Sequence, residues 1–243
     1  MSIKYNYNEI IDMIGAKIDE DAGSFYRNKA VNYRGEVRHS DEKYSEVVAK
    51  HIYDLEKQGK GLKIDKVDHS KEKETIGILH KREHISFNNT NRNEENIAKS
   101  MVKQRSKFIS KTGKEMEAVD YQVPVNRVYH SGDGKIDLIA KGDHRVTICE
   151  LKDNKSEETL LRALLEIETY FRKVSEEKLK KCYDAEIVEK AVIIFANTRP
   201  YNDLKDEFVM KLRDKWDIAI YEAKIDQVGD WPQDARYTLY QIY

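Results

Sequence analysis

The chain has 243 residues, which is enough for one main domain with an extension. Its charged fraction of 36% and its lack of any run of about eighteen apolar residues exclude a membrane-spanning helix. A net charge of -1 argues against a protein that binds nucleic acid non-specifically over its whole surface.

The start of the chain and its cysteine content bear on where the protein works. The first residues, MSIKYNYNEI, lack the apolar core of a signal peptide. The two cysteines, Cys149 and Cys182, are too few for a disulfide scaffold or a structural zinc site. We therefore expect a protein that stays in the reducing cytoplasm.

Residues 1–85 are expected to form a mainly helical extension. The segment NEIIDMIGAKI has a short amphipathic pattern, and Tyr44 to Lys57 places apolar side chains on one face before Gly59 and Gly61 end the helix. The following segment, 59–80, fits either a hairpin or an exposed loop, and both interpretations stay open. The role of this extension is left open.

Residues 86–243 are expected to form a second domain with sharper periodicity. The predicted elements are a helix over 93–108, strands over 118–125, 135–140 and 145–151, a helix over 156–174, a strand over 190–197, a helix over 203–215 and a strand over 217–223. The order is helix, three strands, helix, strand, helix, strand.

Three charged residues, Asp137, Glu150 and Lys152, lie in or beside apolar strand runs, where an unpaired charge is costly. Glu150 and Lys152 share a strand face because they are two residues apart. An even-length loop, formed by residues 142–143 or 141–144, would bring Asp137 to the same face. Two carboxylates on one face can hold a hard divalent cation, and a nearby lysine can position or activate a water.

Asp137, twelve further residues and then Glu150-Leu151-Lys152, set in this order of elements, resemble the PD-(D/E)xK nuclease superfamily. The resemblance covers roughly residues 90–225. It implies an α/β fold with a restriction-endonuclease-like core, in which helices flank a mixed central sheet. It also implies a Mg²⁺ or Mn²⁺ cofactor held by Asp137, Glu150 and the Leu151 carbonyl, with Lys152 assisting the attacking water.

Further site residues follow from the same resemblance. The superfamily's nucleases often place a glutamate on the first helix, and here the apolar side chains of that helix cluster near the direction of Glu94 rather than Glu95. Glu94 is therefore expected to join the metal site, although both acids also suit the positive end of a helix. Glu166 and Tyr170 are accessory candidates, with glutamate where the superfamily often has glutamine.

The function that this resemblance implies is metal-dependent hydrolysis of phosphodiester bonds in nucleic acid, with DNA favoured over RNA. Within the basic segment KSMVKQRSKFISKTGK, the candidate nucleic-acid contacts are Lys103, Arg105, Lys107 and Lys111. A solvated helix face is the structural alternative for this segment. A homodimer is left open.

Two other function classes stay open. One is a protein on a nuclease-like fold that binds or regulates nucleic acid without cleaving it. The other is a zinc metallopeptidase, because HKREH matches H-x-x-E-H through His80, Glu83 and His84. That motif needs a helix, whereas the surrounding β-branched residues favour strands.

Overall fold

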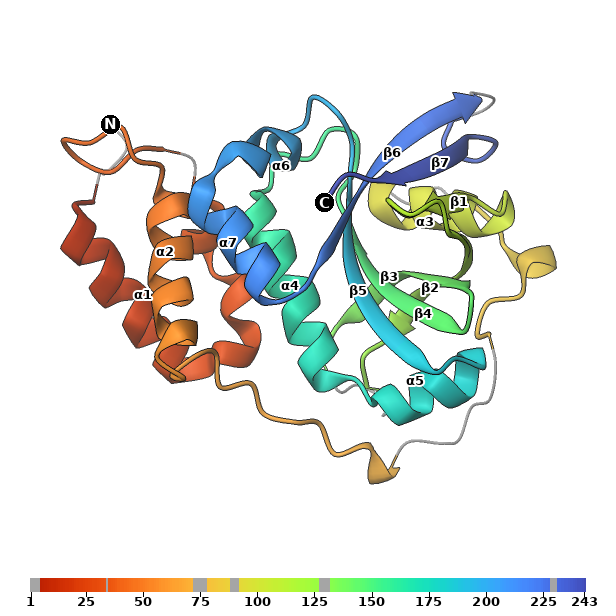
Figure 1. The fold of residues 1–243 in the computed structure, drawn as a ribbon, viewed down its shortest axis with the longest axis horizontal. Helices are drawn as coiled ribbons and strands as arrows, with labels where there is room; N and C mark the ends of the chain where they lie inside the picture. The colour runs from red at the N-terminus through yellow and green to blue at the C-terminus, as the bar shows by residue number, and fades with distance from the viewer. Residues whose placement is uncertain (1–4, 34, 72–77, 88–91, 127–131, 228–230) are drawn as a thin grey trace.

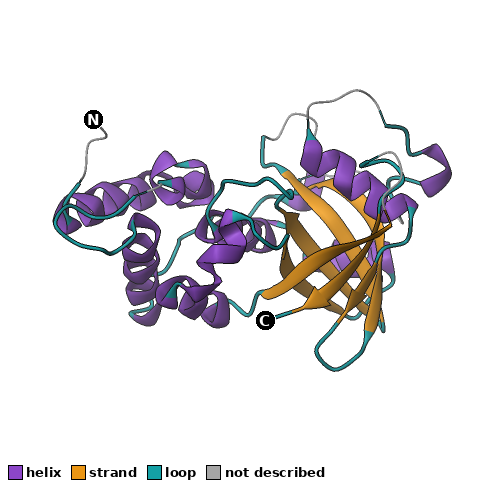
Figure 2. Cartoon of the chain, turned by 90° about the horizontal axis from the view of Figure 1, so that it is seen from above, coloured by secondary structure: helices purple, strands orange, loops and turns teal. Residues whose placement is uncertain are grey.

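The structure is a computed structural model of the chain that describes residues 5–33, 35–71, 78–87, 92–126, 132–227 and 231–243. An N-terminal helical region lies beside a β-barrel that carries further helices (Figures 1 and 2). No helix of the described residues is long and apolar enough to cross a membrane.

The N-terminal region is helical, as the sequence predicts. Its elements are α1 (Tyr7–Asp21), η1 (Ala22–Arg27), η2 (Lys29–Asn32) and α2 (Tyr44–Lys57). Asn6 begins α1 with a capping box, in which its side chain accepts from the Glu9 amide at 3.0 Å and the Glu9 side chain accepts from the Asn6 amide at 2.7 Å. The described part of the segment after α2 contains no strand, which favours the loop interpretation.

Seven strands form a closed barrel in chain order. They are β1 (Lys107–Ile109), β2 (Glu115–Pro124), β3 (Lys135–Gly142), β4 (Arg145–Leu151), β5 (Ile187–Ile194), β6 (Ala219–Gln227) and β7 (Arg236–Gln241). Strand β1 pairs in parallel with β7 and so closes the barrel. The pairs β4–β5 and β5–β6 are also parallel, and the remaining neighbours are antiparallel.

Helices flank the barrel and connect its strands. They are α3 (Asn93–Lys103), α4 (Leu160–Lys173), α5 (Glu176–Tyr183), α6 (Arg199–Asn202) and α7 (Glu207–Lys215), with short turns η3 (His69–Lys71), η4 (Arg82–His84) and η5 (Asp203–Lys205). The Thr159 hydroxyl caps α4 by accepting from the Arg162 amide at 3.2 Å, and it donates to the Val31 carbonyl at 2.6 Å. This contact joins the N-terminal region to the helix that carries part of the candidate site.

The two faces of the barrel wall belong to two hydrophobic cores. Side chains from all seven strands, among them Phe108, Leu138 and Leu151, form one cluster with the apolar face of α3, which places that cluster inside the barrel. The alternate residues Ile139 and Ile148 belong to the other cluster, which includes α4 and the N-terminal helices. Strand alternation therefore directs Asp137 and Glu150 outwards, towards α4.

The sequence predicts a restriction-endonuclease-like core with a mixed central sheet flanked by helices, and this prediction is wrong, because the sheet closes into a barrel. Closure depends on β1 and β7, neither of which the periodicity predicts. Strand β1 has only three residues and overlaps the end of the predicted helix 93–108, whereas the observed helix α3 ends at Lys103. The short helix α5 was also missed, and α4 begins at Leu160 rather than near residue 156.

We predict that barrel closure contributes strongly to stability. Phe108 is fully buried in β1 and packs edge-on against Tyr221, with 5.2 Å between ring centroids. Phe108→Ala should lower the free energy of unfolding by about 3–5 kcal/mol in urea denaturation, because it leaves a cavity at the closing strand. Tyr240→Ala, on the exposed side of neighbouring β7, should cost less than about 1 kcal/mol. Similar losses from both variants would contradict the closed barrel.

Candidate active site

The β3–β4 hairpin brings the two central carboxylates together. Its turn is Asp143-His144, whose φ values of 49° and 58° suit a two-residue hairpin turn. Leu138 pairs with Cys149, so Asp137 lies across from Glu150 on the same face. The predicted even-length loop is confirmed, although the turn residues are 143–144 rather than 142–143 or 141–144.

Lys152 lies at the centre of the cluster. It is 3% exposed, and its Nζ lies 2.6 Å from Glu150 Oε1, 2.9 Å from Glu158 Oε2 and 3.4 Å from Glu166 Oε2. Burial alone would lower the pKa of Lys152, but Glu150 and Glu166 outweigh this effect and hold it well above the ordinary value. Lys152 is therefore a proton-bearing donor at neutral pH and not a base.

A chain of side-chain contacts leads from Lys152 through Glu166 and Tyr170 of α4 to the N-terminal region. The Tyr170 hydroxyl donates to Glu166 Oε1 at 2.9 Å, and Glu166 contacts Lys152. The Tyr26 and Tyr170 hydroxyls lie 3.3 Å apart, and Arg27 Nε donates to the Tyr26 hydroxyl at 2.8 Å. The structure thus brings the predicted accessory pair into the site and adds two residues of the extension that the sequence did not reveal.

Helix α3 carries Glu94 and Glu95, which line the same cavity but make different contacts. Glu94 lines the same cavity as Asp137 and Glu158, and burial is the main cause that raises its pKa. Glu95 instead binds Lys99 at 2.8 Å, and that ion pair leads the effects that lower its pKa. The position of Glu94 beside Asp137 at the cavity agrees with the expectation that Glu94 faces the candidate site.

Asp137 is held at both oxygens. Gln122 Nε2 donates to Oδ1 at 2.9 Å, and the Leu151 amide donates to Oδ2 at 3.0 Å. The sequence analysis assigned the Leu151 carbonyl to a metal, whereas the observed contact uses its N–H. It missed Gln122, since no pattern distinguishes this residue from any other polar strand residue.

Three carboxyls of the cluster, those of Glu94, Asp137 and Glu150, have pKa values above their ordinary range, whereas the pKa of Glu166 is lowered. Burial raises the pKa of Asp137 to about 6 and that of Glu94 to about 7, against the favourable effect of Lys152. Burial, followed by the charges of Asp137 and Glu166, also raises the pKa of Glu150. Like charges held close together out of water have this effect, and a bound cation would reverse it.

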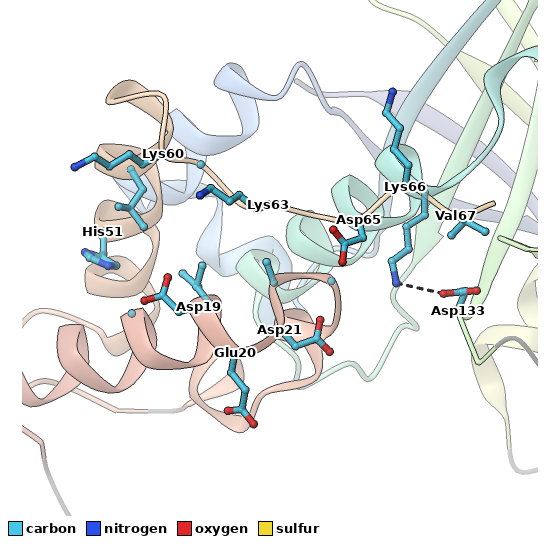
Figure 3. A pocket seen from close by; sticks show the side chains of 17 residues that line it. Asp19, Glu20, Asp21, His51, Lys60, Lys63, Asp65, Lys66, Val67 and Asp133 are labelled. Atoms are coloured by element: carbon cyan, nitrogen blue, oxygen red, sulfur yellow. Dashed lines mark hydrogen bonds and ion pairs between the residues drawn. The ribbon is translucent and has the colours of Figure 1, made fainter. Parts of the chain in front are cut away.

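A cavity of about 530 Å³ is lined by Glu94 and Asp137, but not by the buried Glu150 and Lys152. Its lining includes Arg92, Glu94, Gln122, Asp137, Lys155 and Glu158. A larger cavity of about 770 Å³ lies between α1 and the segment after α2, and its lining includes acids at the end of α1 and lysines of that segment (Figure 3). None of the predicted site residues lines the larger cavity, so the smaller one defines the candidate site.

The carboxylates of the cluster are the groups that could bind a divalent cation. Among the described residues, no three His, Cys, Asp or Glu side chains form a group ready to hold a metal ion. The contacts explain this, because Glu150 is turned to Lys152 and Asp137 to Gln122 and the Leu151 amide. The carboxylate oxygens of Glu94, Asp137 and Glu150 nevertheless suit a hard divalent cation chemically, provided that Glu150 turns away from Lys152.

The predicted nucleic-acid contacts lie away from the acidic cavity. Lys103 ends α3, at the opposite end of the helix from Glu94, and its Nζ lies 5.1 Å from the centroid of the Phe87 ring. Lys107 pairs with Glu115 at 2.9 Å, and Lys111 lies over Tyr243 at 5.4 Å. Arg105 follows the helix in a turn with φ 54°. Their role in binding stays a prediction.

The zinc-peptidase motif lacks the geometry that it requires. Arg82–His84 forms one 3₁₀ turn, so His80 and His84 do not share the face of an α-helix. His80 Nδ1 instead lies 2.8 Å from Asp120 Oδ1, and its ring packs on Tyr121 with 4.2 Å between centroids. His80 therefore serves to fasten its segment to β2.

Comparisons with protein-family models, curated proteins and solved structures gave no match. The resemblance to PD-(D/E)xK nucleases therefore rests on the residues of the motif alone.

The raised pKa of Asp137 predicts a pH-dependent stability. Because its pKa rises from 3.8 to about 6, folding favours the protonated form, and this stabilisation is complete below about pH 4 and lost as the pH rises through 6. Asp137→Asn cannot ionise. Its free energy of unfolding should match the wild type near about pH 4 and exceed it by about 3 kcal/mol near about pH 8.

Urea denaturation at both pH values measures this difference. Asp184→Asn, at a side chain open to solvent, is the matched control and should show no such change between the two pH values. A difference between Asp137→Asn and wild type that is the same at both pH values would contradict the electrostatic account of the site.

Proposed function

We propose that this chain is a divalent-cation-dependent hydrolase that cleaves phosphodiester bonds in nucleic acid, with DNA as the favoured substrate. One observation carries the proposal: Asp137 and Glu150 lie opposite each other in neighbouring strands, with Lys152 on the same face and Glu94 beside them. Together they form an acidic cluster with one buried cationic donor next to a cavity.

Glu94, Asp137 and Glu150 would hold a magnesium or manganese ion. The ion would polarise a phosphoryl oxygen and favour ionisation of water at neutral pH. Carboxylates with raised pKa values support this assignment, since a cation compensates charges that burial leaves uncompensated. Glu150 would need to turn from Lys152 towards the ion.

Lys152 would then orient either the attacking water or a phosphoryl oxygen. Its ammonium group has three donors, and Glu158 and Glu166 retain two contacts when Glu150 turns away. Tyr170 fixes the Glu166 carboxylate through its hydroxyl. A charged donor held by buried groups stabilises negative charge more strongly than one in water.

The choice of nucleic acid as substrate comes from the motif formed by Asp137, Glu150 and Lys152. Two basic residues at the cavity, Arg92 and Lys155, could meet phosphates on either side of the reacting group. A protein that binds nucleic acid without cleaving it remains the second candidate.

We predict that the acids and the lysine act as a unit. Asp137→Asn, Glu150→Gln and Lys152→Met should each slow Mg²⁺- or Mn²⁺-dependent cleavage by about 100-fold or more, because cation binding and water positioning depend on one another. Glu94→Gln should lose far more activity than its neighbour Glu95→Gln, which serves as the matched control.

The assay uses supercoiled plasmid, single-stranded DNA and RNA, with either cation and then with a chelator. Circular dichroism would verify that each variant is folded. Cleavage that persists in chelator, or folded variants that cut at the wild-type rate, would refute the proposed chemistry. Binding of these substrates without cleavage would support the second candidate.

A further inference from the structure

A third cavity, of about 660 Å³, lies at the end of the barrel away from the candidate active site. Every strand contributes to its lining a residue at this end, or one beside it, because β1, β3 and β7 finish here and the other strands begin here. Asp137 and Glu150 lie towards the other end, where the Ser100 hydroxyl of α3 donates to the Ala235 carbonyl at 2.8 Å, just before β7. This open end, the barrel mouth, is therefore separate from the acidic cluster.

Two buried hydroxyl side chains point into the barrel at its mouth. Tyr221 belongs to the interior core, and Thr147 lies two residues before Cys149, another member of that core, so strand alternation turns it inwards as well. Thr147 is 1% exposed and Tyr221 is 3% exposed, yet both line the cavity. The barrel mouth thus contains polar groups that the strands hold in fixed positions.

Neither hydroxyl has a strong hydrogen-bond partner. Thr147 donates to the sulfur of Met116 at 3.4 Å, and a thioether is a weak acceptor. Within the described parts of the chain, no hydrogen bond joins the Tyr221 hydroxyl to another residue. Burial is the main cause that raises the pKa of Tyr221, so its hydroxyl keeps its proton and can both donate and accept. A ligand that met both hydroxyls would supply the partners that buried polar groups require.

The charges that line the cavity balance one another. Four basic and four acidic residues contribute to it, and at the rim Arg145 pairs with Glu189 at 2.6 Å. Each basic member pairs with an acid, and these members are Lys114, Arg145, Lys190 and Arg213. The last two lie where the cavity extends past β5 to the outer face of the barrel wall. Such a lining has no excess charge to attract an ion, which favours an uncharged ligand.

We infer that the barrel mouth binds an uncharged ring compound of the nucleobase or nucleoside class, a function independent of the proposed cleavage site. The aromatic ring of Tyr221 and the thioether of Met116 offer polarisable apolar surfaces that suit a flat ring. Because each hydroxyl can donate or accept, the matching ring carries both kinds of group on its edge, as a nucleobase does. Small-molecule sites of this size commonly occupy the mouths of β-barrels.

Isothermal titration of the full chain with adenosine, guanosine, cytidine and uridine tests this inference. EDTA in the buffer keeps divalent cations out of the measurement. At least one nucleoside should bind to the wild type. Tyr221→Phe and Thr147→Val each remove one hydroxyl and keep the shape of the side chain, so each should raise the Kd about five- to ten-fold, the effect of one lost hydrogen bond.

Tyr237→Phe is the matched control. Tyr237 is another tyrosine of the interior core and is 2% exposed, but it lies near the start of β7 and outside the lining of the cavity. This variant should bind the nucleoside with the wild-type Kd. Circular dichroism would verify that all three variants are folded.

Four results would overturn the inference. They are the absence of binding by any nucleoside, an unchanged Kd in both hydroxyl variants, binding of ribose as tight as that of the nucleoside, and tighter binding of the nucleoside monophosphate than of the nucleoside. The second would place the ligand elsewhere, the third would refute recognition of the ring, and the fourth would refute the charge argument. None of them bears on the proposed cleavage, because the assay excludes the cation on which cleavage depends.

Discussion

A single ammonium group buried among carboxylates is the interaction on which the candidate site depends. Lys152 Nζ lies within 3.4 Å of carboxylate oxygens of Glu150, Glu158 and Glu166. The carboxyls of Asp137 and Glu94 also interact electrostatically with this ammonium group. Arg162 pairs with Glu158 at 2.8 Å, but burial still raises the pKa values of Glu94, Asp137 and Glu150 against the favourable effect of Lys152. The site is therefore short of positive charge, a property that favours cation binding.

The barrel makes this arrangement possible because its wall separates two environments. Inward side chains of β3 and β4, such as Leu138 and Leu151, fill the interior, and their alternates face α4. The charged residues occupy the end of this outer face, where α4 contributes Glu166 and Tyr170. Contacts from η1 reach the same network, so the N-terminal region completes the surroundings of the site.

Local patterns predict much of the site but not its enclosure. Alternation and an even-length turn place Asp137 with Glu150, and helical periodicity separates Glu94 from Glu95, because both depend on residues close in sequence. The pairing of three-residue β1 with β7 joins segments about 130 residues apart and has no local signal. The left-handed φ of Gln122 and the contact between Tyr26 and Tyr170 likewise arise only from tertiary packing.

The central claim is that the acidic cluster holds a divalent cation. Anomalous diffraction from crystals grown with Mn²⁺ tests it most directly. The account predicts a strong peak bounded by the carboxylates of Glu94, Asp137 and Glu150, with Glu150 turned away from Lys152. A cluster without such a peak, with the Glu150–Lys152 contact intact at a saturating Mn²⁺ concentration, would contradict it.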